Sequence, residues 1–188
     1  MQKILNDLIT LVGYTEADAQ TLRAVSGQTQ LWATAVSTAF YDTVYAYPPT
    51  AAVFQKGERP AREETLIQWY TLLVSGLIDD DFWQWQWYVG LIHIPRGIRN
   101  AYMMGMMSRL QQLFGQQCLR TFDSEQALAV YTAFKRVTDV VAGLIAESYF
   151  ESYIEAVERA TTETKYTLDR RVEAAIAEMV AEAQGVRL

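Results

Sequence analysis

The chain has 188 residues, with 16 Lys and Arg against 22 Asp and Glu, so its formal net charge is −6. A chain of this length can bury a full core in one domain, and its acidic balance argues against binding to nucleic acid or to an anionic membrane surface. One cysteine and one histidine exclude an intramolecular disulfide scaffold, zinc fingers, iron–sulfur clusters and multi-histidine metal sites.

The distribution of proline predicts an all-α fold. The last of four prolines is Pro95, and the 93 residues after it contain none. Because proline is excluded from helix interiors, its absence over such a stretch permits long helices. Residue types that favour helices are abundant, and no Asn-Gly or Asp-Gly hairpin turn occurs. We expect one helical domain over residues 1–160, followed by a helical extension over residues 161–188.

End signals along the chain place the expected helices. Gly13 ends an amphipathic opening helix, and Thr15 begins the next one in a weak capping box with Asp18. Ser26–Gly27 predicts a break, and Pro48–Pro49 ends the following long helix. The expected helices span residues 2–12, 16–25, 29–47, 61–77, 82–94, 95–119 and 124 onward, with a further amphipathic segment around residues 168–180.

The second half of the chain carries equally clear signals. Asp79–Asp81 places acidic side chains where a helix dipole favours them, at the start of a helix. Pro95 is expected to end that helix and to be the first residue of the next. Asp123 or Ser124 is expected to cap the last long helix, which could bend near Thr161–Thr162.

The chemistry of the sequence is concentrated around its only histidine, His93, at the end of a predicted helix. Val89 and Gly90 share its face, and the small Gly90 would leave room for a planar group beside the imidazole. An imidazole on an apolar helix face is often a core histidine with satisfied hydrogen bonds. The alternative is the single axial ligand of a haem iron, whose sixth coordination position would stay open for a gas.

The residues around His93 resemble a family motif. Val89–His93 followed by Arg96–Ile98 is similar to the apolar-G-x-x-H-x-x-x-G-apolar motif of the sensor globins, which comprise the globin domains of globin-coupled sensors and the related protoglobins. Phe40–Asp42 resembles the distal helix of that family, and the resemblance covers roughly residues 15–160. An aromatic run that precedes the histidine in protoglobins has its counterpart in Trp83, Trp85 and Trp87.

The resemblance implies a globin fold with an additional N-terminal helix and little or no D helix. It also implies that haem b lies between the helix bearing Thr65 and the helix bearing His93, and that the protein binds O2, CO and NO. The other side chains expected to contact the haem on this basis are Phe54, Leu66, Trp69, Val89 and Met104.

Tyr41 is the candidate distal residue, since a phenol can donate a hydrogen bond to bound O2. It matches a tyrosine that the sensor globins use, although an ordinary core tyrosine bonded to a backbone carbonyl is the alternative. Tyr45, one turn later, is its rival. Thr65 is a second polar candidate, and a one-residue shift in the alignment would replace it by Glu64 or Leu66.

Other side chains have two interpretations each. Arg96 and Arg99 could pair with a haem propionate or could be solvated surface charges. The Met103–Met107 cluster is better explained by flexible core packing than by iron ligation, although Met104, eleven residues after the histidine, is expected to line the haem. Cys118 is expected to be a small buried hydrophobe, because a c-type haem anchor needs the sequence C-x-x-C-H.

Apolar stripes over Val130–Ile145 and Leu168–Val180 exceed what one globin core needs, and they predict a homodimer formed through the C-terminal helices. The alternative is that the tail folds back on its own domain. No phosphate loop or kinase motif is present, so we expect a gas sensor that acts through a separate partner, or an O2 binder, in the cytoplasm. The alternatives are a haem enzyme performing NO dioxygenation or peroxidase-like chemistry, and a haem-free globin-like regulator.

Overall fold

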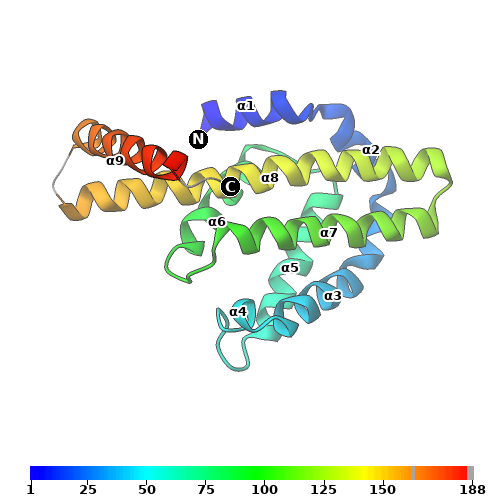
Figure 1. Ribbon diagram of the computed structural model, residues 1–188. Coiled ribbons are helices and arrows are strands. Elements are labelled where there is room, and N and C mark those ends of the chain that lie inside the picture. Colours follow the sequence, from blue (N-terminus) through cyan, green and yellow to red (C-terminus); the bar gives the residue numbers. More distant parts are fainter. Residues whose placement is uncertain (162–163, 186–188) are drawn as a thin grey trace. The chain divides into compact units, whose positions relative to one another are not determined.

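The computed structural model describes residues 1–161 and 164–185, and every regular element in them is helical, which confirms the predicted all-α class (Figure 1). The chain divides into two compact units, Met1–Tyr149 and Phe150–Leu188. No helix within the described residues has both the length and the apolar character needed to cross a membrane. The elements are α1 Gln2–Val12, α2 Glu16–Thr29, the 3-10 turn η1 Gln30–Trp32, α3 Ala33–Ala46, α4 Pro48–Ala51, α5 Arg59–Val74, α6 Asp80–His93, α7 Asn100–Thr121, α8 Ser124–Thr161 and α9 Lys165–Gly185.

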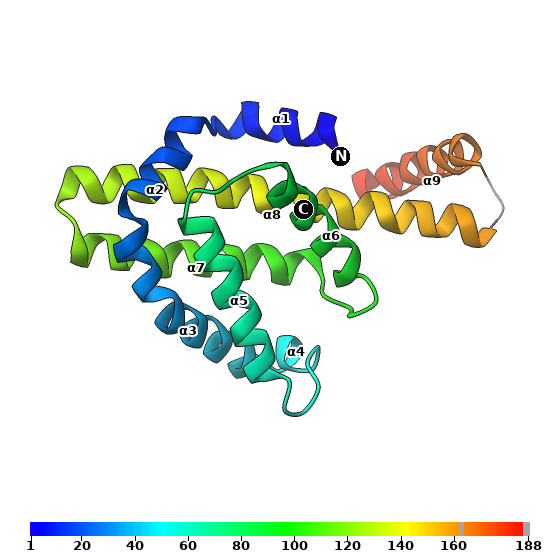
Figure 2. The same ribbon diagram turned by 180° about the vertical axis from the view of Figure 1, so that it is seen from behind.

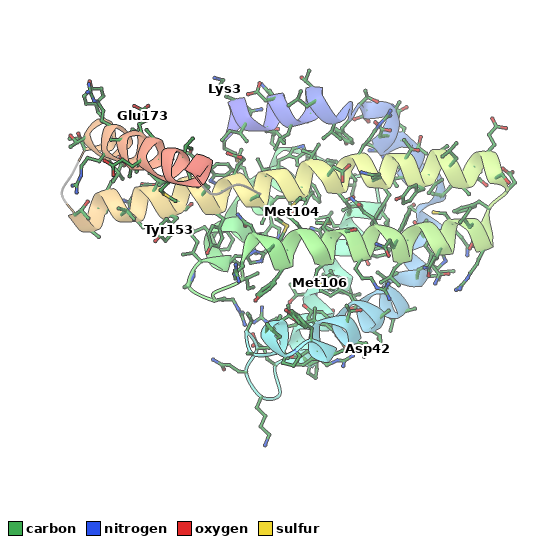
Figure 3. All side chains as sticks on the ribbon, viewed as in Figure 1. Lys3, Asp42, Met104, Met106, Tyr153 and Glu173 are labelled. Atoms are coloured by element: carbon green, nitrogen blue, oxygen red, sulfur yellow. The ribbon has the colours of Figure 1, made fainter. Side chains whose placement is uncertain are left out.

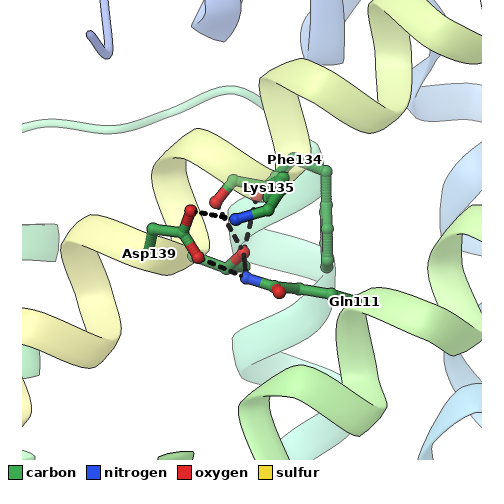
Figure 4. Close-up of polar contacts among 5 residues, drawn as sticks. Gln111, Phe134, Lys135 and Asp139 are labelled. Atoms are coloured by element: carbon green, nitrogen blue, oxygen red, sulfur yellow. Dashed lines mark hydrogen bonds and ion pairs between the residues drawn. The ribbon is translucent and has the colours of Figure 1, made fainter. Parts of the chain in front are cut away.

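The core of the first unit is built on α7 and α8, which run side by side in both views (Figures 1 and 2). Phe114 of α7 stacks on Phe134 of α8 with ring centroids 3.7 Å apart. A polar contact fixes the same pair of helices, since the Gln111 amide donates to Thr138 Oγ1 at 2.9 Å and to Asp139 Oδ1 at 2.7 Å (Figure 4). These contacts make the pair a rigid support for the shorter helices.

Several predicted helix ends are confirmed. Gly13 ends α1 with a φ of 74°, a conformation that glycine adopts at no steric cost. The Thr15 backbone N–H donates to Asp18 Oδ2 at 2.8 Å, which forms part of the capping box at the start of α2. Asp79 accepts from the Phe82 backbone at the start of α6, and Asp123 accepts from the Gln126 backbone at the start of α8.

The predicted break at Ser26–Gly27 is wrong, because α2 continues through it to Thr29. The chain turns instead in η1, over residues 30–32. The Tyr70 hydroxyl of α5 donates to the Thr29 carbonyl at 3.0 Å, so a distant side chain satisfies a carbonyl at the end of α2. This contact stabilises the end of α2 at Thr29.

The prediction that Pro95 begins the next helix is also wrong. The structure places a loop over residues 94–99, and α7 starts only at Asn100. Gly97 in this loop has a φ of 68°, which is incompatible with a right-handed helix. The loop folds back, since the Ile98 N–H donates to the His93 carbonyl at 3.1 Å.

Gly90 allows α6 to lie directly on α8. A Cβ atom at this position would lie 2.5 Å from the Ile145 carbonyl oxygen and 2.6 Å from Ser148 Cβ. The Ser148 hydroxyl donates to the Trp87 carbonyl at the same crossing. The expected space for a planar group at Gly90 is therefore occupied by the backbone of α8.

A Gly90→Ala change should lower the free energy of unfolding by about 1–3 kcal/mol, because the added methyl group meets backbone that cannot rotate away. Gly105→Ala is the matched control in α7, where the new Cβ meets nothing within 4 Å. That change should stabilise the protein by about 0.5–1 kcal/mol. Urea unfolding of the haem-free variants, followed by circular dichroism, measures both values. A Gly90→Ala variant as stable as the unchanged chain would contradict this helix crossing.

Candidate functional site

A cavity of about 270 Å³ lies within the first unit. Side chains from α3 to α8 line it, and most of them are apolar, which suits a hydrophobic ligand. The polar exceptions are few, as in most ligand pockets. They are Tyr41, Thr50, Arg62, Thr65, Gln86, His93, Arg96 and Tyr102.

Two helices form opposite walls of this cavity. The wall from α5 presents residues three and four apart, as one face of a helix requires. The wall from α6 does the same and ends at His93. The α5 residues are Arg62, Thr65, Leu66 and Trp69, and the α6 residues are Trp85, Gln86, Val89, Ile92 and His93.

His93 has an unusual environment for a core histidine. Its Nδ1 atom is buried and has no hydrogen-bond partner among the described residues. Burial, with a smaller contribution from the neighbouring Arg96 guanidinium, lowers the pKa of the imidazole to about 4. A buried polar atom without a partner is costly, whereas a neutral imidazole is the form that binds a metal. The histidine therefore fits the ligand role better than the core role.

The pKa of His93 can be measured directly, because the chain contains no other histidine. In the haem-free protein we expect the imidazole NMR signals to titrate near pH 4. The folded-state pKa lies below the unfolded value of 6.5, so the unfolded chain takes up the proton first as the pH falls. The contribution of this group to stability is thus present above pH 6.5 and is lost as the pH falls towards 4. A midpoint at or above 6.5 would contradict the burial.

Tyr41 of α3 lies on the cavity, and only 7% of it is exposed. Its ring packs edge-on against Phe54, with centroids 6.0 Å apart. Burial raises the pKa of its hydroxyl to about 12, so the hydroxyl keeps its proton at neutral pH and can donate it. Tyr45 does not line the cavity, and the Arg59 guanidinium lies 5.5 Å from the centre of its ring. The geometry thus favours Tyr41 over its rival.

The positions of side chains on α5 decide among Thr65, Glu64 and Leu66, the three alternatives for the second residue on the distal side. Thr65 and Leu66 line the cavity, whereas Glu64 does not. The Thr65 hydroxyl donates to the Ala61 carbonyl at 2.9 Å. Its proton is therefore engaged within its own helix, which makes Thr65 a weaker donor candidate than Tyr41.

At the buried end of the cavity, a hydrogen bond joins the two walls. The Trp69 indole N–H of α5 donates to Gln86 Oε1 of α6 at 3.0 Å. The Gln86 amide in turn donates to the Phe82 carbonyl at 3.0 Å, and Gln86 is fully buried. Gln86 is thus held at both ends of its amide, and Trp69 has a fixed orientation.

At the other end, ion pairs join the walls. Glu58, which precedes α5, pairs with Arg96 in the loop after α6, and its Oε1 atom also lies 2.7 Å from Arg62 Nε. The hydrogen bond from Arg96 lowers the pKa of the Glu58 carboxyl to about 2, and the Gln55 backbone N–H contributes. Both arginines line the cavity. We call these three residues, Glu58, Arg62 and Arg96, the rim cluster.

Seven of the eight side chains predicted to bind haem or iron come together around this cavity. Met104 is the exception, because it is 51% exposed and does not line the cavity (Figure 3). Arg99 does not line it either, and its guanidinium lies over the Tyr102 ring. Cys118 is buried away from the cavity, as expected of a small hydrophobe. The seven are Tyr41, Phe54, Thr65, Leu66, Trp69, Val89 and His93.

Other residues in and around the cavity could not be named from the sequence. Arg62 and Gln86 lie one helical turn before Thr65 and Val89 and share their helix faces. Their positions at the cavity therefore follow from the helical period of these two predicted residues. Met103, Met106 and Met107, which the sequence predicts to be part of a packing cluster, also line the cavity. Glu58 had no signal of its own in the sequence.

Comparison with solved structures defines the class of protein. The globin domain of a globin-coupled sensor from Geobacter sulfurreducens superposes with a TM-score of 0.71 at 19% identity, covering 77% of this chain and 96% of that one. The ferric globin domain of Escherichia coli DosC gives a TM-score of 0.62 at 16% identity, covering 77% of this chain and 98% of that one. The fold is that of a globin.

Within the globins, the sequence matches the profile of the Protoglobin family over residues 1–155. The chain therefore belongs to the Protoglobin family, which confirms the resemblance described above and implies haem binding. No curated protein matches the sequence.

Proposed function

We propose that this protein holds haem b in the cavity between α5 and α6, with His93 as the protein ligand of the iron. The observation that carries the proposal is the position of the His93 imidazole on the wall of an apolar cavity, where its Nδ1 atom is buried and has no hydrogen-bond partner among the described residues. Bound haem supplies an iron atom with a coordination position open to a diatomic gas. The residues around the cavity would then determine the relative affinities for the gases and their dissociation rates.

Tyr41 is the residue proposed to select O2. Its hydroxyl holds a proton at neutral pH and lies on the cavity among the aromatic rings of Phe40 and Phe54. A donor in such an apolar place stabilises a gas that carries negative charge, as bound O2 does, more than it stabilises CO. The protein would therefore bind O2 reversibly, and CO and NO as well.

We further propose that the protein acts in the cytoplasm as a gas sensor through a separate partner, or as an O2 binder. Residues 1–160 would form the haem-binding globin, and the extension over 161–188 would contribute to a homodimer. The apolar stripe over Val130–Ile145 is buried in the core of the first unit, so it does not support association as expected. Other large apolar side chains are exposed on the last turns of α8 and on α9, and covering such surface favours association. They are Phe150, Tyr153, Tyr166, Val172, Ile176, Met179 and Val180.

Haem titration of the purified protein tests this proposal. The expected result is a Soret band that saturates at one haem per chain and shifts when the reduced protein is exposed to O2 or CO. A protein that gives no Soret band with added haem would instead be a haem-free helical regulator, and His93 would be a core residue.

A further inference from the structure

The rim cluster connects parts of the chain that would otherwise be free to separate. Arg62 comes from the α5 wall, and Arg96 follows the α6 wall by three residues. One carboxylate, that of Glu58, contacts both guanidiniums. The Gln55 backbone N–H donates to the other oxygen of Glu58 at 2.9 Å, so the carboxylate is fixed from a third direction.

Glu58 lies behind the arginines rather than in the cavity. Its side chain is only 14% exposed, yet it does not line the cavity, whereas both arginines do. Each guanidinium carries five N–H donors. Arg96 donates one of them to Glu58, and Arg62 is paired with the same carboxylate by charge, without a hydrogen bond from its Nε atom. Donors therefore remain on both arginines for an anion that approaches from the cavity side.

The charges around the cavity match those of haem. Among the described residues that line it, Arg62 and Arg96 are the ones with a permanent charge, and both are at the same end. Haem is apolar except for its two propionates, which lie together on one edge. Guanidinium groups bind carboxylates through paired N–H donors, in a geometry that depends on how the guanidinium is held.

We propose that Glu58 is a positioning residue for haem: it holds Arg62 and Arg96 at the rim so that their remaining donors meet the propionates. This inference rests on the proposed haem binding. Glu58 itself touches no part of the haem and acts through the two arginines. Without its carboxylate, each arginine would lose its fixed partner and spread over many side-chain conformations.

The test compares haem with haem dimethyl ester, whose propionates carry no charge. The rate at which each leaves the protein is measured by transfer to an excess of a tight haem-binding acceptor. Glu58→Gln removes the charge with little change in shape. Glu63→Gln is the matched control, because Glu63 also pairs with an arginine of α5, Arg59, but contacts neither rim arginine. Circular dichroism verifies that both variants keep the helical fold.

The expected result is that Glu58→Gln loses haem about tenfold faster than the unchanged protein, as the weakening of charge-assisted hydrogen bonds predicts. Its loss of the dimethyl ester should be unchanged, and Glu63→Gln should change neither rate. Equal acceleration for haem and ester would overturn the inference, because Glu58 would then act only on the structure of the loop. Slower loss of haem would also overturn it, since Glu58 would then compete with the propionates. If the unchanged protein bound no haem, the proposed function itself would fail.

Discussion

A protein with His93 replaced by alanine should bind haem more than about 100-fold more weakly than the unchanged chain. Loss of an outer hydrogen-bond partner of a metal ligand already costs roughly 10–100-fold in affinity, and removal of the ligand itself costs more. No other histidine exists in the chain to replace it. Haem titration, followed at the Soret band, measures the change.

A second variant separates ligation from packing. His93→Gly leaves a space at the end of α6 that free imidazole can fill, so added imidazole should restore a five-coordinate haem spectrum to this variant. Ala and Gly variants that both bind haem with unchanged affinity would show that His93 is not the ligand. Failure of imidazole to restore binding, in a variant that remains folded, would show that the loss came from disturbed packing.

Replacing Tyr41 by phenylalanine should raise the O2 dissociation rate by about 10–100-fold. A hydrogen bond to a charged group contributes about 1.5–3 kcal/mol, and each 1.4 kcal/mol is a tenfold change in rate or affinity. CO develops less negative charge, so its dissociation rate should change much less. Laser photolysis or stopped-flow mixing of the reduced haem protein gives both rates.

Tyr45→Phe is the matched control, because it removes a hydroxyl of the same kind from a tyrosine one helical turn away that does not line the cavity. Its O2 dissociation rate should equal that of the unchanged protein. The rate of the unchanged protein should also be constant between pH 6 and 9, since the pKa of Tyr41 lies near 12. A normal rate in Tyr41→Phe together with a fast rate in Tyr45→Phe would assign the donor to Tyr45.

Local signals in the sequence were sufficient for most helix ends. The conformation of Gly13 and the capping box of Thr15 depend on residues within one turn, so the sequence contains them directly. The end of α2 could not be predicted in this way. The carbonyl of its last residue is bonded to the Tyr70 hydroxyl, which comes from 41 residues further along the chain. Such contacts exist only after the helices have packed together.

The same distinction explains which site residues could be predicted. His93 and Tyr41 carry side chains whose chemistry stands out within a recognisable motif. Met104 was expected at the cavity from its spacing of eleven residues from His93, which gives a shared face only in one continuous helix. The loop over residues 94–99 breaks that helix, so the spacing from His93 no longer determines which side of α7 Met104 faces. Glu58 acts across 38 residues of sequence and left no local pattern.

The two bridges between α5 and α6 differ in kind. The hydrogen bond from Trp69 to Gln86 joins two uncharged groups and is partly buried, so salt has little effect on it. The rim cluster is ionic and partly exposed, so salt can screen it. The helices α5 and α6 are therefore joined at two places, by an uncharged hydrogen bond at Gln86 and by the ion pairs of the rim cluster. Raising the ionic strength is therefore expected to weaken the connection at the rim cluster first and to leave the one at Gln86 in place.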